Sequence, residues 1–125
     1  MGRNKLPSQR QLRVGELIRH ALAAMLTRSE IHDPVLERTA VTVSEVAISP
    51  DLRKATAYVV PLGGAGTQEV LQALNRARKF IRGRIAGEVH LRNSPEVFFK
   101  LDETFDYSDK IEGLLHSPKV APDLD

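Results

Sequence analysis

Cysteine and tryptophan are both absent from this chain of 125 residues, and only six residues are aromatic. Without cysteine, neither a disulfide framework nor a thiolate metal site can form, which fits a reducing compartment. No apolar run approaches the roughly 20 residues that a membrane-spanning helix needs, and residues 1–7 lack the apolar core of a signal peptide. We therefore expect a cytoplasmic protein of one domain with a modest core.

The formal net charge of +2 conceals an uneven distribution of charge along the chain. Residues 1–28 and residues 76–92 each hold six cations against one Glu, so each segment carries a net charge of +5. Residues 102–125 hold two cations against seven carboxylates, a net charge of −5. Such a polarised chain attracts polyanions locally whatever its total charge, but charge alone leaves RNA, DNA and membrane surfaces open as partners.

The most informative stretch is a basic segment in which five cations and no acid fall within residues 76–84. Apolar residues recur there at steps of three and four, as on one face of a helix: Val70, Leu74, Ala77, Ile81 and Ile85. At about 100° per residue, Arg78, Lys79 and Arg82 fall on one flank of this stripe, and Arg76 and Arg84 fall on the other side. The stripe predicts a buried face, and the cations form either a solvated surface or one that binds phosphates.

The periodicity of the whole chain predicts an α+β domain with a three-stranded sheet and the helices packed on one face. The expected elements, in chain order, are a helix from Ser8 to about residue 28, strands 39–49 and 53–61, a helical region 67–91, strand 97–101 and a short helix 107–115. The first two strands should form an antiparallel hairpin, with a bulge near Ser44 and Glu45. Residues 1–7 should be a flexible basic N-terminus, residues 8–116 the domain, and residues 117–125 a disordered acidic tail.

Local signals predict where these elements begin and break. Ser8 and Thr67 are good N-cap residues for the first and the central helical region. Asp33-Pro34 should open a loop, because the residue before proline disfavours helix. The central region is long for one helix, and Gly83 and Gly87 weaken it, so we expect a kink or a break into two helices.

No catalytic constellation emerges from the sequence. The four histidines fall in different predicted elements, so we expect no metal site and no cofactor. The glycine-rich residues 63–66 continue as Thr-Gln-Glu, where a phosphate-binding loop needs Gly-Lys-Ser/Thr. The acidic residues after position 101 are interpreted as solubilising charge. We expect that the protein is not an enzyme.

Binding of nucleic acid has more support, because arginine and lysine on a helix flank can neutralise phosphates. Aromatic residues that could stack on bases are scarce. Phe80 and Tyr58 are candidates, but we interpret both as packing in the core or on the sheet. The sequence therefore favours recognition of the nucleic-acid backbone and shape over reading of splayed bases.

Several ordered blocks of residues carry a resemblance to one family. They are Arg13-Val14 with Glu16-Leu17-Ile18, Val41-Thr42-Val43 with Val46, Ser49-Pro50-Asp51-Leu52 with Ala55 and Tyr58-Val59, Ala73-Leu74, Phe80-Ile81-Arg82, and Leu91-Arg92 with Pro95-Glu96 and Phe98-Phe99. Each block is weak alone, but the ordered set is specific. Over roughly residues 8–116 the chain resembles ribosome-binding factor A, a bacterial assembly factor of the small ribosomal subunit.

The resemblance implies a KH-type fold of the second topology, in agreement with the predicted order of elements. KH domains usually hold nucleic-acid backbone with a Gly-x-x-Gly loop between two helices, which this family replaces by an interhelical kink marked Ala-x-Gly. The matching residues here are Ala77-Arg78-Lys79, so a lysine stands in place of the glycine. This departure adds a cation where RNA would approach.

The function that the resemblance implies is non-enzymatic. The family binds the free small (30S) subunit, contacts 16S rRNA near the decoding region, and supports late maturation of that RNA, including its 5′ end. Release is linked to a GTPase assembly factor, and we expect a monomer with no membrane partner. From charge and placement, the predicted contacts to the RNA backbone are Arg76, Arg78, Lys79, Arg82, Arg84, Arg92, Arg10 and Arg13.

Two alternatives remain open at this point. A generic KH-like binder would hold arbitrary single strands of RNA or DNA about as well as it holds subunits. A protein-interaction module would use its basic face for an acidic protein, and its complexes would survive the removal of RNA.

Overall fold

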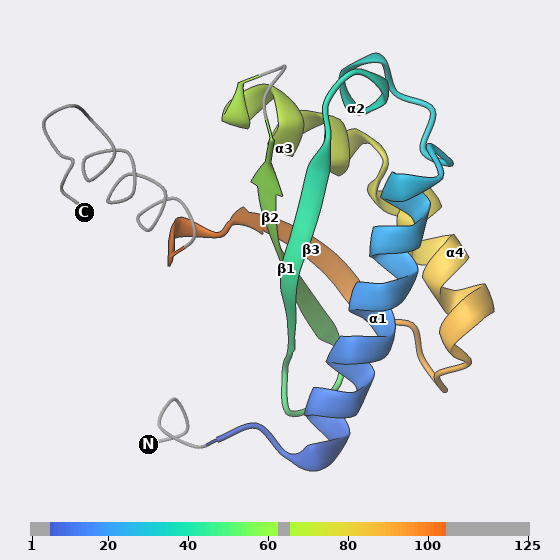
Figure 1. Ribbon diagram of the computed structural model, residues 1–125. Coiled ribbons are helices and arrows are strands. Elements are labelled where there is room, and N and C mark those ends of the chain that lie inside the picture. The colour runs from blue at the N-terminus through green and yellow to red at the C-terminus, as the bar shows by residue number, and fades with distance from the viewer. Residues whose placement is uncertain (1–5, 63–65, 105–125) are drawn as a thin grey trace, which may run out of the picture.

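The computed structural model of the chain describes residues 6–62 and 66–104 (Figure 1). Its elements, in chain order, are α1 (Gln9–Thr27), α2 (Pro34–Glu37), β1 (Val41–Ile48), β2 (Lys54–Pro61), α3 (Thr67–Arg76), α4 (Arg78–Val89) and β3 (Glu96–Leu101). The predicted α+β class and the order of the strands are confirmed. The expected helix 107–115 and the acidic tail lie outside the described residues. No described helix has the length and hydropathy that crossing a bilayer requires.

The three strands form one mixed sheet in the order β1-β2-β3. Strands β1 and β2 pair antiparallel, which confirms the predicted hairpin, whereas β2 and β3 pair parallel. A parallel pair needs a long crossover connection, and here α3 and α4 supply it. The basic segment therefore lies in the crossover that packs against the sheet.

A bulge in β1 keeps the apolar residues of that strand on one face. Val43 pairs with Val59 and Glu45 pairs with Tyr58, so Ser44 is the extra residue. Because side chains alternate along a strand, one extra residue moves the following side chains to the other face. Val43, Val46 and Ile48 are consequently all buried, although their spacing is not strictly alternating. The predicted bulge is confirmed.

The core lies between the sheet and the three longer helices, which cover one of its faces (Figure 1). Helix α1 buries Val14, Ile18, Ala21, Leu22 and Met25 in this core. From the apolar stripe expected in the central region, Val70 and Leu74 of α3 and Ile81 and Ile85 of α4 are buried there as well. At the start of α1, the Ser8 hydroxyl accepts a hydrogen bond from the Gln11 N–H, and the Gln11 side chain accepts one from the Ser8 N–H. This reciprocal cap confirms the predicted start of α1.

Three local expectations were wrong. Asp33-Pro34 does not open a loop but begins the short helix α2, with Asp33 as N-cap and proline at the first helical position, where it is tolerated. Gly66, not Thr67, caps α3. The expected break of the central region into two helices is confirmed, but it lies at Ala77 and not at Gly83 or Gly87. Both glycines lie inside α4, where burial of Ile81 and Ile85 outweighs the low helix propensity of glycine.

One glycine is required by the packing of α1 on the sheet. A Cβ atom on Gly15 would lie 2.4 Å from the backbone oxygen of Val46, beside the bulge. That distance is far below van der Waals contact, and the obstructing atom belongs to backbone. Gly15 therefore sets how closely α1 approaches β1.

We expect Gly15→Ala to lower the free energy of unfolding by about 1–3 kcal/mol, because α1 and β1 must move apart. Gly83→Ala is the matched control, since a Cβ atom there meets nothing within 4 Å. It should raise stability by about 0.5–1 kcal/mol, the usual gain of alanine over glycine in a helix. Urea denaturation measures both, and equal effects of the two substitutions would contradict this account.

Candidate nucleic-acid interface

The central helical region breaks at Ala77, which is both the C-cap of α3 and the N-cap of α4. Its N–H donates to the carbonyl oxygens of Ala73 and Leu74, at 3.1 and 3.2 Å, and its own carbonyl accepts from the Ile81 N–H at 2.9 Å. Hydrogen bonding thus continues on both sides of the bend. The break at Ala77 coincides with the first residue of the kink that the family resemblance placed at Ala77-Arg78-Lys79.

A buried carboxylate holds this bend against α2. Asp33 is 7% exposed, and it accepts hydrogen bonds from Arg76 Nε at 3.0 Å and Arg76 Nη2 at 3.1 Å. It also caps α2 through the Val35 N–H at 2.9 Å. Because Arg76 is the last residue of α3, this two-point contact fixes where the helix ends and the bend begins.

The hydrogen bonds from Arg76, aided by those from the backbone of α2, lower the pKa of Asp33 below its usual value. Burial of the carboxylate acts in the opposite direction and is outweighed. The same contact raises the pKa of Arg76. The pair is therefore charged at neutral pH, and Arg76 is committed to the fold even though its side chain is partly exposed.

The cations of the basic segment divide between two flanks, as the helical spacing predicts. On the flank facing the connection between α1 and α2, Arg84 contacts Glu30 of that connection and also Glu88 of α4, the latter at 3.2 Å. Hydrogen bonding to Glu88, with the charges of both carboxylates, raises the pKa of Arg84. Both cations of this flank, Arg76 and Arg84, are thus neutralised by carboxylates of the same chain.

The cations of the other flank lie toward β3 and are less constrained. Arg78 lies 3.7 Å from a Glu96 oxygen, and its guanidinium carbon is 5.1 Å from the centre of the Phe98 ring. Arg82 donates to the backbone oxygen of Ser94 at 3.0 Å, and among the described residues no carboxylate pairs with it. Lys79 is exposed and contacts no carboxylate within the described part of the chain.

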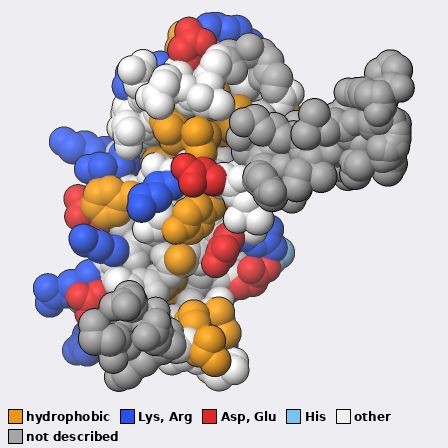
Figure 2. Space-filling view, turned by 90° about the vertical axis from the view of Figure 1, so that its left-hand side faces the viewer, with side chains coloured by type: hydrophobic (Ala, Val, Ile, Leu, Met, Phe, Trp, Pro, Cys, Tyr) orange, Lys and Arg blue, Asp and Glu red, His pale blue; other side chains and the backbone are white. Residues whose placement is uncertain are grey.

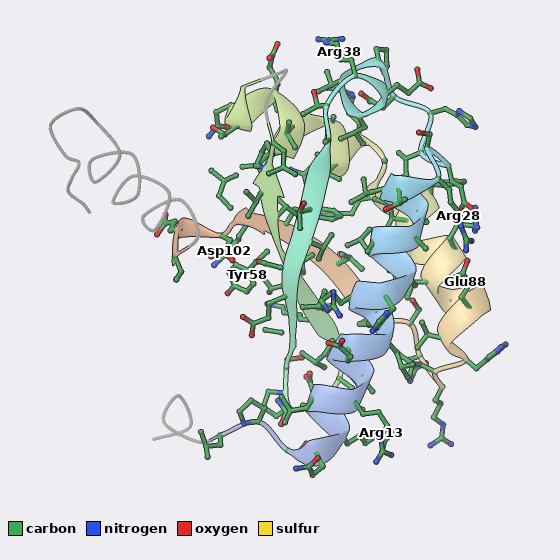
Figure 3. The ribbon with its side chains drawn as sticks, viewed as in Figure 1. Arg13, Arg28, Arg38, Tyr58, Glu88 and Asp102 are labelled. Atoms are coloured by element: carbon green, nitrogen blue, oxygen red, sulfur yellow. The ribbon has the colours of Figure 1, made fainter. Side chains whose placement is uncertain are left out.

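The structure does not bring the remaining predicted cations to this bend. Arg10 and Arg13 lie near the start of α1, at the opposite end from Arg28 (Figure 3). Arg28 contacts Glu30, the partner of Arg84, so the bend is near the other end of α1. Arg13 and Arg28 are separated by about 22 Å along the helix. Arg92 follows α4 at the end remote from Ala77.

Phe80 is the residue that sequence reasoning placed wrongly. It was interpreted as packing in the core or on the sheet, but Phe80 is 45% exposed. It lines a hollow of about 390 Å³ at the bend, with Glu30, Ile31, His32, Asp33, Arg76 and Ala77. Helical spacing contained the signal, because Phe80 is four residues from both Arg76 and Arg84 and so shares their flank.

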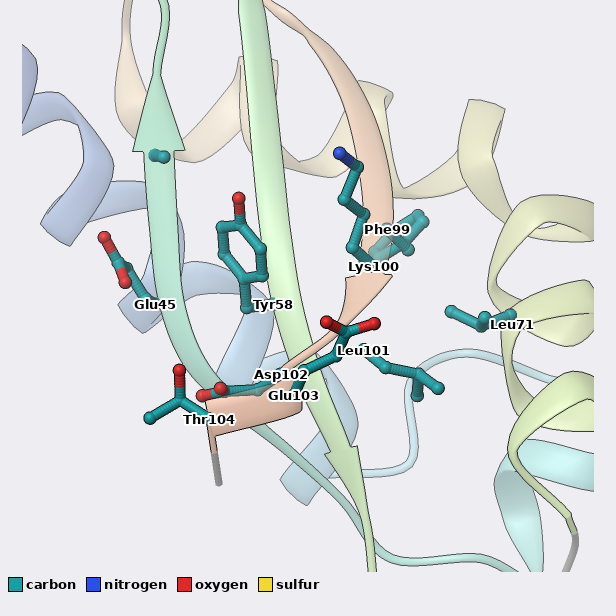
Figure 4. Close-up of a pocket in the computed structure, with 10 residues that line it drawn as sticks. Glu45, Tyr58, Leu71, Phe99, Lys100, Leu101, Asp102, Glu103 and Thr104 are labelled. Atoms are coloured by element: carbon teal, nitrogen blue, oxygen red, sulfur yellow. The ribbon is translucent and has the colours of Figure 1, made fainter. Parts of the chain in front are cut away.

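A second hollow, of about 730 Å³, lies at the end of the sheet near Asp102 (Figure 4). Glu45, Asp102 and Glu103 line it against the single cation Lys100. Tyr58 lies in the sheet there, as expected. Figure 2 looks toward this uncovered face, where carboxylates and apolar side chains alternate and cations gather along one margin. The excess of carboxylates makes this hollow a poor site for a polyanion, so the bend is the better candidate.

The described residues hold no group of three or more histidine, aspartate or glutamate side chains that could bind a metal ion. What the bend offers is a set of guanidinium and ammonium groups, an exposed aromatic ring and a fixed backbone. These groups bind phosphates and planar rings, and they do not form a nucleophile–base pair.

Comparisons with known proteins agree on one family. The family model described as ribosome-binding factor A matches residues 10–115. Ribosome-binding factor A of Beijerinckia indica is 56% identical over 119 residues, which cover 95% of this chain and 84% of that protein. The crystal structure of ribosome-binding factor A from Thermus thermophilus is 26% identical, with a TM-score of 0.62 over 73% of this chain and 94% of its own.

A further similar structure is a homology model of the Thermus thermophilus factor, fitted into the cryo-EM map of a complex of that factor with the 30S subunit. It is 26% identical and has a TM-score of 0.58, over 69% of this chain and 88% of its own.

We expect Asp33→Asn to lower the free energy of unfolding by about 1–3 kcal/mol at pH 7, because it weakens two charge-assisted hydrogen bonds. The folded protein holds the pKa of Asp33 below its unfolded value of about 4. The stabilisation is therefore complete above that value and is lost as the pH falls through the lowered pKa. The difference in free energy of unfolding between the variant and the wild type should therefore become smaller below about pH 4.

Glu37→Gln is the control, because Glu37 forms only an exposed contact. Its Oε2 lies 3.5 Å from Nδ1 of the exposed His32. Thermal melts between pH 3 and pH 7 measure both variants, and we expect little change for the control. A destabilisation by Asp33→Asn that is equal at pH 3 and pH 7 would show that the charge of Asp33 does not matter.

Proposed function

The chain belongs to the ribosome-binding factor A family, and from this membership we propose that it binds the free small ribosomal subunit as a non-enzymatic assembly factor. In this role it supports late maturation of 16S rRNA, including processing of the 5′ end. The observation that carries the proposal is the family match over residues 10–115. The fitted complex of the similar Thermus thermophilus factor with the 30S subunit supports the choice of partner.

The bend between α3 and α4 is the part of the surface that we assign to rRNA. Lys79 and Arg82 lie on the flank toward β3, and neither has a carboxylate partner within the described residues. Binding of phosphates by such groups releases counterions from the RNA, which gives affinity without reading sequence. Arg78 adds a third cation, whose planar group is steadied by the ring of Phe98.

A fixed basic surface of this kind acts on RNA by selecting a conformation. A factor that binds one arrangement of the rRNA better than its alternatives shifts the population toward that arrangement by its difference in affinity. No bond needs to be made or broken by the protein. Release then follows when the subunit reaches a state that binds the factor less well. We assign the trigger of release to a GTPase assembly factor. We further propose that the protein acts as a monomer.

Co-sedimentation of the tagged protein with purified 30S subunits, 50S subunits and 70S ribosomes, over a salt series, tests the proposal. We expect selective binding to free 30S subunits that weakens steeply as salt rises. Equal binding to all particles and to arbitrary single strands would favour the generic binder. Complexes that survive ribonuclease would favour the protein-interaction module.

We expect Lys79→Glu to weaken binding to 30S subunits and to make the plot of log affinity against log salt shallower by about 1. Adding Arg82→Glu should extend both effects. Arg53→Glu is the charge-matched control, because Arg53 is an exposed cation in the turn between β1 and β2, outside α3 and α4. Equal losses of affinity for Lys79→Glu and Arg53→Glu would mean that only total charge matters.

A further inference from the structure

The ring of Phe80 has no packing role that explains its place in the first turn of α4. The contacts of α4 with the core are made by the fully buried Ile81 and Ile85 and by the partly buried Val89, and Phe80 is not among the residues packed against that core. An exposed phenylalanine keeps apolar surface in water, and in a monomeric protein such surface often marks a binding site. Phe80 is the one large aromatic side chain among the exposed hydrophobic residues of the described chain.

The surroundings of Phe80 define the chemistry of its partner. The ring lines the hollow of about 390 Å³ beside the bend, in the size range of small-ligand sites. The carboxylates at this hollow are already satisfied, because Asp33 accepts from Arg76 and Glu30 contacts Arg84. The guanidinium carbon of Arg84 lies over the Phe80 ring, 5.8 Å from its centre. The charges around the ring therefore cancel in pairs, and its apolar surface fits a flat, uncharged group. Lys79, the preceding residue, offers a cation to an anionic chain that carries such a group.

We propose that Phe80 is a stacking site for one unpaired nucleobase of the RNA strand whose phosphates contact Lys79, an inference that rests on the proposed function. Lys79 precedes Phe80 in the first turn of α4 and both are exposed, so a short stretch of RNA that passes around this turn can place a phosphate at Lys79 and a base on Phe80. Stacking is tolerant of sequence, because every base has a π-face. The site therefore requires that the base at one position of the RNA be unpaired, but it does not require a particular kind of base.

Affinity and its dependence on salt separate this site from the phosphate contacts. Phe80→Leu keeps an apolar side chain but removes the aromatic face, and we expect about 10-fold weaker binding to 30S subunits at a fixed salt concentration. The slope of log affinity against log salt should stay unchanged, since no cation is lost. Leu17→Ala, at a leucine of α1 that is 47% exposed, is the control and should bind as the wild type does.

Phe80→Trp tests stacking directly. The chain has no tryptophan, so the F80W protein contains a single indole. We expect this variant to retain affinity for 30S subunits and its fluorescence to be quenched on binding. Thermal melts check that each variant folds, which is expected because the side chain is exposed.

A benzophenone-bearing phenylalanine at position 80 identifies the partner by photo-cross-linking in the 30S complex. A cross-link to 16S rRNA, with loss of affinity in F80L, is the expected result. A cross-link only to a ribosomal protein, or F80L binding as tightly as the wild type, would overturn the stacking site while leaving subunit binding intact. Failure of the wild-type protein to bind 30S subunits would instead overturn the proposed function on which the site rests.

Discussion

The bend between α3 and α4 depends on one buried carboxylate. Asp33 caps α2 and, with its oxygens, holds the guanidinium of Arg76 at the last residue of α3. A buried carboxylate is costly unless its oxygens accept hydrogen bonds, and both oxygens of Asp33 do so. The contact joins two segments 43 residues apart. It fixes the position of α2 and the point where the central helix turns, and hence the direction in which α4 presents its cations.

This constraint changes how the charge of the basic segment should be counted. The sequence contains five cations within residues 76–84, but Arg76 and Arg84 are in contact with Asp33 and Glu30. Such pairs contribute to the position of the helices and little to the field outside the protein, because each cation is opposed by an anion nearby. The outward field at the bend comes mainly from the flank that contains Lys79 and Arg82. An interface inferred from the number of cations alone would be too broad.

Much of the fold was predictable because it depends on local patterns. The reciprocal cap at Ser8, the hairpin and the bulge at Ser44 follow from spacing and from the types of residue involved. The site of the break did not follow from local propensity, which pointed to Gly83 and Gly87. A glycine costs a helix about 1 kcal/mol, less than the burial of one isoleucine contributes, so packing kept α4 intact. The kink that the family resemblance implied begins at Ala77, the residue at which the helices are broken.

The tertiary contacts of the site were beyond the reach of periodicity. Nothing in the spacing of residues 30–33 indicates that Glu30 and Asp33 meet arginines of the central region, because such pairing depends on where the chain folds back. The short helix α2 was readable, since aspartate followed by proline is a typical N-cap and first helical residue. The prediction of a loop rested on the residue before proline, which disfavours helix. Asp33 is indeed extended, but as an N-cap it lets a helix begin directly after it.

The break at Ala77 also explains why one apolar stripe serves two helices. Ala77 ends α3 and starts α4 with no residue between them, so the helical phase is kept across the bend. Val70 and Leu74 before it and Ile81 and Ile85 after it are all fully buried in the same core. Because this core holds both helices, the outer face at the bend is formed before any partner arrives. A preformed surface loses little conformational entropy on binding, so its contacts contribute more fully to affinity than those of a flexible loop would.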